Sequence, residues 1–196
     1  MSEARNRTTA AIVDRPAPEL DTVAWFGVDR PPTLRELRGR VVVLEAFQML
    51  CPGCVAYGIP QAQRVHDLFG EDVAVLGLHT VFEHHAAMTP VALEAFLTEY
   101  RITFPVGIDR HEAGDPRPVT MRRYGMVGTP TTVVVDRAGI VRHHVFGRED
   151  DLRLGAVIGR LLGASSPDDV ASDPPGVPRE GCSDVGCSHE GGGTTP

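Results

Sequence analysis

Two cysteines, Cys51 and Cys54, are separated by a Pro-Gly pair in the sequence FQMLCPGCVAYGIP. This CxxC spacing suits three roles: a redox couple that exchanges disulfides, half of a metal site, or a structural pair of thiols. A structural zinc site needs four ligands and usually two such pairs, but the other two cysteines lie far away near the C-terminus. Redox chemistry is therefore the favoured interpretation of the pair.

The neighbouring segments predict how this pair is positioned. A valine-rich apolar run (RVVVLEAFQ, 40–48) predicts a strand buried on both faces, and residues 52–69 predict a helix that follows it. Cys51 then lies where the strand ends, and Cys54 lies in the first helical turn. The unpaired N–H groups at a helix N-terminus stabilise a thiolate, so we expect Cys51 to attack a disulfide and Cys54 to resolve the mixed disulfide.

One carboxylate interrupts the apolar strand, six residues before Cys51. The alternation of side chains along a strand places Glu45 on the same face as Phe47, where burial would raise its pKa. Glu45 could then accept the proton of Cys54 during the attack on the mixed disulfide. The alternative is that Glu45 pairs with an arginine or faces solvent at a sheet edge. A central strand is a costly place for a charge, which favours the proton acceptor.

Further periodic segments extend this strand–helix pattern along the chain. Expected strands span residues 40–48, 73–79, 104–108, 131–136 and 140–146, and expected helices span residues 52–69, 90–100, 119–124 and 150–162. Thr89 and Pro90 supply an N-cap and a first-turn proline for the second helix. The β-α-β-α-β-α-β-β-α order predicts an α/β fold with a mostly parallel sheet, a terminal antiparallel hairpin and helices on both faces.

Composition divides the chain into three parts. Residues 1–13 are polar and expected to be flexible, residues 14–163 form the predicted domain, and residues 164–196 are rich in Pro, Gly and Ser and predict a disordered tail. The net charge of −7 argues against a nucleic-acid partner. No apolar run has the length of a signal peptide or a membrane helix. We therefore expect a cytoplasmic protein without a membrane partner, whose thiols are kept reduced.

Two further groups of cysteine and histidine lie outside the CxxC pair. The tail holds Cys182, Cys187 and His189, which could form a second redox pair that docks on the first, bind a thiophilic metal, or be inert. The segment HTVFEHH (79–85) follows a predicted strand and suits an active-site rim, where His79 could tune the thiolate, a metal site or a solvated loop. The sequence indicates no cofactor, and no residue is assigned as a metal ligand.

Several short motifs occur in the order found in one superfamily. APEL and TLRELRGRVVVLEAF precede CPGC, and ITFPVGID and VGTPTTVVVDRAGIV follow it. Over residues 16–163 the chain resembles the redoxin branch of the thioredoxin-like superfamily, which includes cytochrome-maturation thiol–disulfide reductases and the alkyl hydroperoxide reductase/thiol-specific antioxidant proteins. The resemblance implies a thioredoxin-like fold, in which a central mixed sheet is flanked by helices. It also implies that Thr129–Pro130 is a cis peptide that shapes the substrate groove, and that Glu45 replaces the buried aspartate of thioredoxins.

Four positions depart from the patterns of these relatives. Leu50 stands where thioredoxins have tryptophan, and Pro60 comes one residue later than their helix proline, a shift that a bulge at Gly58 could absorb. Peroxiredoxins have a threonine and a proline where this chain has Gln48 and Leu44. The residues that shape a peroxide pocket are therefore absent, which makes a peroxidase the second candidate.

The sequence thus predicts a thiol–disulfide oxidoreductase that works through a mixed disulfide at Cys51, with Cys54 and Glu45 in the roles given above. Its expected partners are protein or small-molecule disulfides and an electron donor that the sequence does not name. The alternatives are a peroxiredoxin-like thiol peroxidase and a metal- or partner-binding module that uses the C-terminal Cys/His tail.

Overall fold

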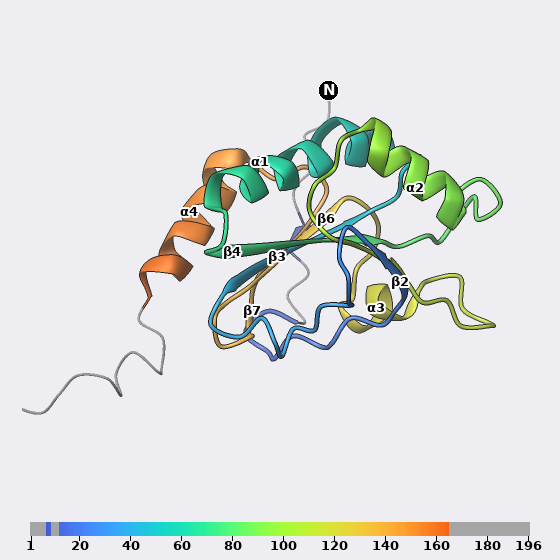
Figure 1. Cartoon of the computed structure of the whole chain (residues 1–196). Coiled ribbons are helices and arrows are strands. Elements are labelled where there is room, and N and C mark those ends of the chain that lie inside the picture. The colour runs from blue at the N-terminus through green and yellow to red at the C-terminus, as the bar shows by residue number, and fades with distance from the viewer. Residues whose placement is uncertain (1–6, 9–11, 165–196) are drawn as a thin grey trace, which may run out of the picture.

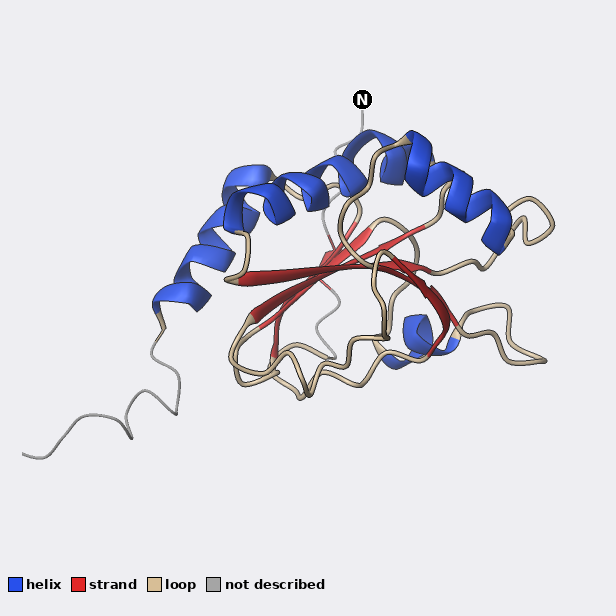
Figure 2. Cartoon of the chain, in the orientation of Figure 1, coloured by secondary structure: helices blue, strands red, loops and turns tan. Residues whose placement is uncertain are grey.

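The computed structural model describes residues 7–8 and 12–164, which form one seven-stranded sheet with helices on both faces (Figure 1, Figure 2). The strands are β1 (Arg7–Thr8), β2 (Thr22–Phe26), β3 (Val41–Phe47), β4 (Val73–His79), β5 (Val106–Asp109), β6 (Thr131–Val135) and β7 (Val141–Phe146). The helices are the π-helix η1 (Cys54–Gly58) and the α-helices α1 (Ile59–Phe69), α2 (Pro90–Glu99), α3 (Val119–Arg123) and α4 (Asp151–Gly163). This architecture confirms the predicted α/β class.

The sheet is mixed, with the strand order β1-β7-β6-β3-β4-β5-β2. β4 runs parallel to both of its neighbours, β3 and β5, whereas β6 runs antiparallel to β3 and the other three pairs are also antiparallel. The prediction of a mostly parallel sheet is therefore wrong, since only the two pairs around β4 are parallel among the described strands. The mixed sheet implied by the superfamily resemblance is confirmed.

Two edge strands have no counterpart in the sequence prediction. β2 pairs antiparallel with β5, but it has only five residues, mostly half-buried, and it follows a proline-rich segment. Within residues 1–13, for which the composition predicts flexibility, the structure adds β1, whose two residues pair with Phe146 and Val145 of β7. Both strands lie at the edges of the sheet. Each pairs with a strand far along the chain, and such a long-range contact leaves no periodic pattern in the local sequence.

Two apolar layers lie on the two faces of the sheet. α1, α2 and α4 cover one face, whereas α3 and several loops lie on the other (Figure 2). All residues of β3 are buried; Val43 and Phe47 belong to the layer under the three helices, and Leu44 and Ala46 belong to the opposite layer. This alternation places Glu45 under the three helices, on the face predicted from the sequence.

The helices that follow β4 and β7 both begin at a capping side chain, and the cap at Thr89 is the one expected from the sequence. The Ala92 N–H donates to Thr89 Oγ1 at 3.2 Å, and Pro90 is the first residue of α2. Asp150 accepts two backbone N–H bonds at 3.0 Å and starts α4. In both cases a side-chain oxygen satisfies N–H groups that have no partner within the helix.

Part of the predicted chemistry lies outside the described residues. Cys182, Cys187 and His189 belong to segment 165–196, so their proposed roles stay predictions. Among residues 7–8 and 12–164, the longest and most apolar helices still fall short of what is needed to cross a membrane.

Candidate active site

The two cysteines of the CxxC pair meet at the junction between β3 and η1, but they differ in exposure. Cys51 is half-buried, and Cys54 is completely buried. The Cys54 N–H donates to Cys51 Sγ at 3.3 Å, and the Cys51 thiol donates to the Thr129 carbonyl at 3.5 Å. Of the two sulfurs, Cys51 is the one that a substrate can reach, because Cys54 is completely buried.

The second thiol is held in its protonated form. Burial raises the pKa of Cys54 well above its ordinary value, and the hydrogen bond with Cys51 raises it further. Cys54 therefore needs a base before it can attack a disulfide at Cys51, because only the thiolate is the nucleophile.

Glu45 is a carboxyl group buried beneath this pair. Its side chain is 1% exposed; Oε2 accepts a hydrogen bond from Thr132 Oγ1 at 2.7 Å, whereas Oε1 has no hydrogen-bond partner among the described residues. Burial raises the pKa of Glu45 to about 7, against a smaller lowering by the Thr132 hydroxyl. Near neutral pH both protonation states are therefore populated, as an acid–base group requires. Its role in proton transfer stays a prediction.

The first turns after Cys51 form a π-helix rather than an α-helix. The Ile59 N–H donates to the Cys54 carbonyl, five residues earlier, which widens the turn. The wider turn accommodates the one extra residue before the helix proline, Pro60, which falls in the first turn of α1. The bulge suggested by the late proline is therefore confirmed.

Gly58, the last residue of the π-helix, lies directly against the Glu45 carboxyl. A Cβ at Gly58 would overlap Glu45 Oε1 and would lie 2.9 Å from Pro130 Cβ. Gly58 is four residues after Cys54, so the unpartnered carboxyl oxygen lies against the helix about one turn beyond the residue that carries the buried thiol. The absence of a side chain at this position is what lets the carboxyl approach the helix.

The Thr129–Pro130 peptide is cis, as the resemblance implies. Pro130 contacts the CxxC turn, since its Cδ lies 3.2 Å from the position of a Cβ on Gly53. The Pro130 carbonyl accepts a hydrogen bond from the Gly147 N–H at 2.8 Å, which anchors the segment to the end of β7. The role of Thr129 and Pro130 in binding an extended substrate stays a prediction.

Two buried side chains brace this site in a way that the sequence did not predict. Gln48 Oε1 accepts from the Phe82 N–H at 3.2 Å, and Gln48 Nε2 donates to Glu83 Oε1 at 3.4 Å. His79 Nε2 accepts from the Met49 N–H at 3.5 Å. Together they tie the turn that carries Cys51 to the end of β4 and the loop after it. A signal was present in the sequence, because both are polar residues at the ends of apolar strands.

The histidines of segment 79–85 do not assemble a metal site among the described residues. Burial lowers the pKa of His79 to about 4, so its ring is neutral and accepts a hydrogen bond instead of carrying a charge near the thiolate. His84 and His85 are exposed. The His85 and His111 rings pack edge-on, with 4.7 Å between their centroids. His79 therefore positions the active-site turn through the Met49 backbone.

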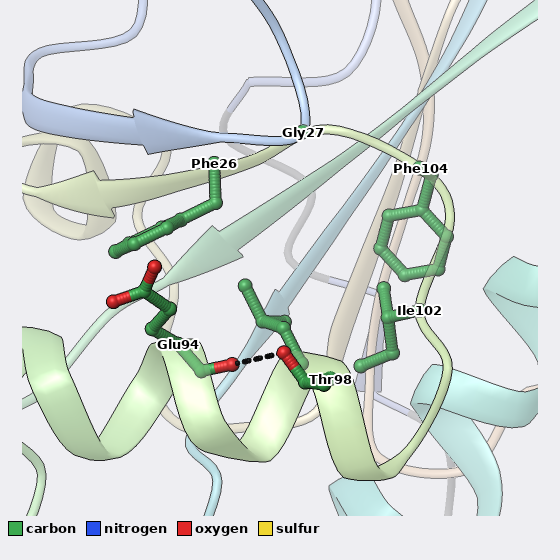
Figure 3. A pocket seen from close by; sticks show the side chains of 7 residues that line it. Phe26, Gly27, Glu94, Thr98, Ile102 and Phe104 are labelled. Carbon is green, nitrogen blue, oxygen red and sulfur yellow. Dashed lines mark hydrogen bonds between the residues drawn. The ribbon is translucent and has the colours of Figure 1, made fainter.

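An open pocket of about 470 Å³ lies beside Cys51. It is lined by Gln48, Leu50, Cys51, Pro52, Phe82, Glu83, His84, Met88, Val127, Gly128, Thr129 and Phe146. A separate cavity of about 250 Å³ lies between the end of β2 and α2, where Phe26, Glu94 and Ile102 line it (Figure 3). The described residues that line this second cavity include no cysteine or histidine and none of the residues of the first. Of these two pockets, the one beside Cys51 is therefore the candidate site for thiol chemistry.

Residues 13–144 match the model of the AhpC/TSA family. The chain belongs to the AhpC/TSA family. The matched segment contains the CxxC pair, Glu45 and the cis-proline, which are the residues that the site brings together.

Solved structures similar to this AhpC/TSA protein agree with the fold. It is 57% identical to a protein of the thioredoxin-like superfamily, with a TM-score of 0.75 and coverage of 78% of this chain and 99% of that chain. It is 46% identical to a thiol-disulfide isomerase from Corynebacterium glutamicum, with a TM-score of 0.73 and coverage of 76% and 97%. The thioredoxin-like fold is therefore confirmed, and these relatives support a thiol–disulfide redox function.

The DipZ proteins of Mycobacterium bovis and Mycobacterium tuberculosis are more distant relatives. They are 26% identical to this AhpC/TSA protein over 155 residues, which is 77% of this chain but 21% of DipZ. The chain thus spans about a fifth of the length of these relatives.

Replacing Gly58 with alanine tests the close approach of the helix to Glu45. We expect Gly58→Ala to lower the free energy of unfolding by about 1–3 kcal/mol, because the new methyl group must displace the carboxyl or Pro130. Gly155→Ala in α4 is the matched control, since nothing lies within 4 Å of its added Cβ. The control should be neutral or more stable by about 0.5–1 kcal/mol in urea unfolding. Equal effects of the two substitutions would contradict the assigned packing.

The pH dependence of stability tests the buried carboxyl. The folded pKa of Glu45, about 7, lies above its ordinary value of 4.5, so the native state binds this proton more tightly than the unfolded state. The free energy of unfolding therefore falls as pH rises from the ordinary pKa of 4.5 to the folded pKa of about 7, by up to about 3 kcal/mol in total. Glu45→Gln lacks this loss and should gain stability relative to wild type between pH 5 and 8.

The difference between the two proteins is the quantity to measure. His79 has a lowered pKa, about 4, so its contribution to stability rises with pH and opposes that of Glu45 in the wild type. This contribution is common to both proteins and cancels in the difference. Parallel stability curves for wild type and Glu45→Gln would show that Glu45 does not titrate in this range.

Proposed function

We propose that this protein is a thiol–disulfide oxidoreductase in which Cys51 attacks the substrate disulfide and Cys54 completes the exchange. The observation that carries the proposal is the asymmetry of the pair: Cys51 is half-buried at a pocket and accepts the Cys54 N–H, whereas Cys54 is completely buried and holds its proton. The substrates are disulfides of proteins or small molecules, in keeping with relatives that include a thiol-disulfide isomerase.

The exchange has two steps that balance in sulfur and electrons. The Cys51 thiolate attacks one sulfur of the substrate disulfide, which forms a mixed disulfide and releases the first substrate thiolate. Cys54, once deprotonated, attacks Cys51 Sγ and releases the second substrate thiolate. The substrate gains two electrons and the enzyme is left with a Cys51–Cys54 disulfide, which an external dithiol reduces for the next cycle.

Glu45 supplies the base for the second step. Its Oε1, which has no hydrogen-bond partner among the described residues, lies against Gly58, one helical turn from Cys54. The pKa of about 7 lets the carboxyl receive the Cys54 proton and lose it again to solvent at neutral pH. The cis peptide at Pro130 accompanies a Thr129 carbonyl that lies beside Cys51, where a substrate backbone would pass.

The peroxidase alternative has weaker support from the same site. Peroxiredoxins use a threonine hydroxyl three residues before the reactive cysteine, and here Gln48 occupies that position. The Gln48 amide is engaged on both sides by the loop after β4, so it is not available to bind a peroxide. The alternative that uses Cys182, Cys187 and His189 rests on residues that the structure does not describe.

Insulin reduction with dithiothreitol tests the proposed roles. Wild type should accelerate the precipitation of insulin chains, whereas Cys51→Ser should fall to the rate of dithiothreitol alone, because the attacking sulfur is missing. Cys54→Ser should accumulate a mixed disulfide at Cys51 that mass spectrometry detects. The double variant Cys182→Ser/Cys187→Ser is the control and should keep the wild-type rate. A Cys51→Ser variant as fast as wild type would move the chemistry away from the CxxC pair, and a control as slow as dithiothreitol alone would assign a necessary role to the tail cysteines.

A further inference from the structure

The pocket beside Cys51 has a composition that selects among disulfides. We propose that it accepts polypeptide disulfides in which the residues next to the attacked cysteine carry an apolar side chain and a positive charge, and that it disfavours anionic small disulfides such as glutathione disulfide. The inference rests on the proposed thiol–disulfide function and adds the substrate class.

The walls of the pocket nearest the thiol are apolar. Leu50, the residue before Cys51, is 55% exposed, and Val127, two residues before Thr129, is 63% exposed. Phe82, Met88 and Phe146 also line the pocket. Two large apolar side chains left in water at the rim of a pocket that contains a thiol mark a contact surface for an apolar partner group.

The polar part of the pocket lining is the Glu83 carboxylate, which the buried Gln48 side chain holds in place. Gln48 is 1% exposed, and its amide contacts both the Phe82 N–H and Glu83 Oε1, so it fixes the start of the loop that carries Glu83. Glu83 itself is exposed, and its second oxygen has no hydrogen-bond partner among the described residues. The buried amide thus orients one carboxylate oxygen and leaves the other for a ligand.

The charge of the pocket favours a cation. Among the described residues that line it, Glu83 is the only carboxylate, His84 is the only basic group and none is an arginine. The Arg148 guanidinium lies over the Tyr57 ring, 4.6 Å from its centroid, and Arg148 does not line this pocket. A lysine or arginine near the substrate cysteine would pair with Glu83, whereas the carboxylates of glutathione, which outnumber its amines, would be repelled.

The test uses peptide substrates that differ by one residue. Each peptide carries a cysteine joined as a mixed disulfide to thionitrobenzoate, and Cys51 attacks the peptide sulfur because thionitrobenzoate is the better leaving group. Its release is followed by absorbance in single turnovers with the full chain. The flanking sequences Cys-Leu-Lys, Cys-Leu-Glu and Cys-Ser-Lys separate the charge contribution from the apolar one.

Wild type should react with Cys-Leu-Lys faster than with Cys-Leu-Glu by roughly three- to tenfold at low salt, and high salt should reduce this ratio. Cys-Ser-Lys should be slower than Cys-Leu-Lys by a similar factor. Glu83→Gln should remove the charge preference, and Glu83→Arg should reverse it and speed the reaction with glutathione disulfide. Glu94→Arg makes the same charge change on the exposed surface of α2 and should keep the wild-type preference.

The outcomes separate the inference from the proposed function. Equal rates for the Lys and Glu peptides, or an equal change of preference in Glu94→Arg, would overturn the inference and leave the oxidoreductase proposal standing. Equal rates for the Leu and Ser peptides would overturn its apolar half. If wild type releases no thionitrobenzoate from any peptide and also fails to reduce insulin, the proposed function itself falls.

Discussion

The burial of two ionisable groups beneath one accessible sulfur is the constraint on which the site depends. Cys54 and Glu45 are both removed from water at the junction of β3 and η1, and burial raises the pKa of each. The Cys54 thiol and the Glu45 carboxyl therefore both hold their protons more tightly than the same groups would in water. The accessible Cys51 receives a backbone N–H instead, so the three groups differ in role because they differ in surroundings.

The fold supplies this arrangement through the central strand and the wide turn that follows it. β3 is buried along its whole length between β4 and β6, which places Glu45 opposite Thr132, its hydrogen-bond partner. The π-helix then brings Gly58 against the free oxygen of the carboxyl, and the cis-proline before β6 closes the same space. The extra residue before the helix proline and the absence of a side chain at Gly58 thus both allow the helix to pack closely against the Glu45 carboxyl.

Much of this site could be predicted from the sequence because its determinants are local. The CxxC spacing, the charge within an apolar strand, the late proline and the N-caps each involve residues close together in the chain. The edge strands β1 and β2 and the antiparallel direction of β6 could not be predicted in this way, since they depend on partners far along the sequence. The polar residues Gln48 and His79 at the ends of two apolar strands were a signal in the sequence, but their bonding partners could not be predicted, because each lies thirty or more residues away.

Gln48 is the position at which this site differs most clearly from that of the peroxiredoxins. Where peroxiredoxins present a hydroxyl to the peroxide, this chain buries an amide that organises the neighbouring loop. The loop in turn brings Glu83 to the rim of the pocket. The position that carries a hydroxyl in peroxiredoxins therefore holds the loop after β4 in place here. The cytoplasmic location stays a prediction.

Proton transfer from Cys54 to Glu45 is tested most directly by the rate at which Cys54 resolves a mixed disulfide at Cys51, measured across pH in single turnovers of wild type and Glu45→Gln. We predict a wild-type rate that rises with pH through an inflection near pH 7, where Glu45 becomes ionised, and levels off above it. In Glu45→Gln the resolution should be slow and should lack the inflection near pH 7, because the amide cannot accept the proton. Identical profiles for the two proteins would show that Glu45 takes no part in moving the proton and would contradict its role as the base.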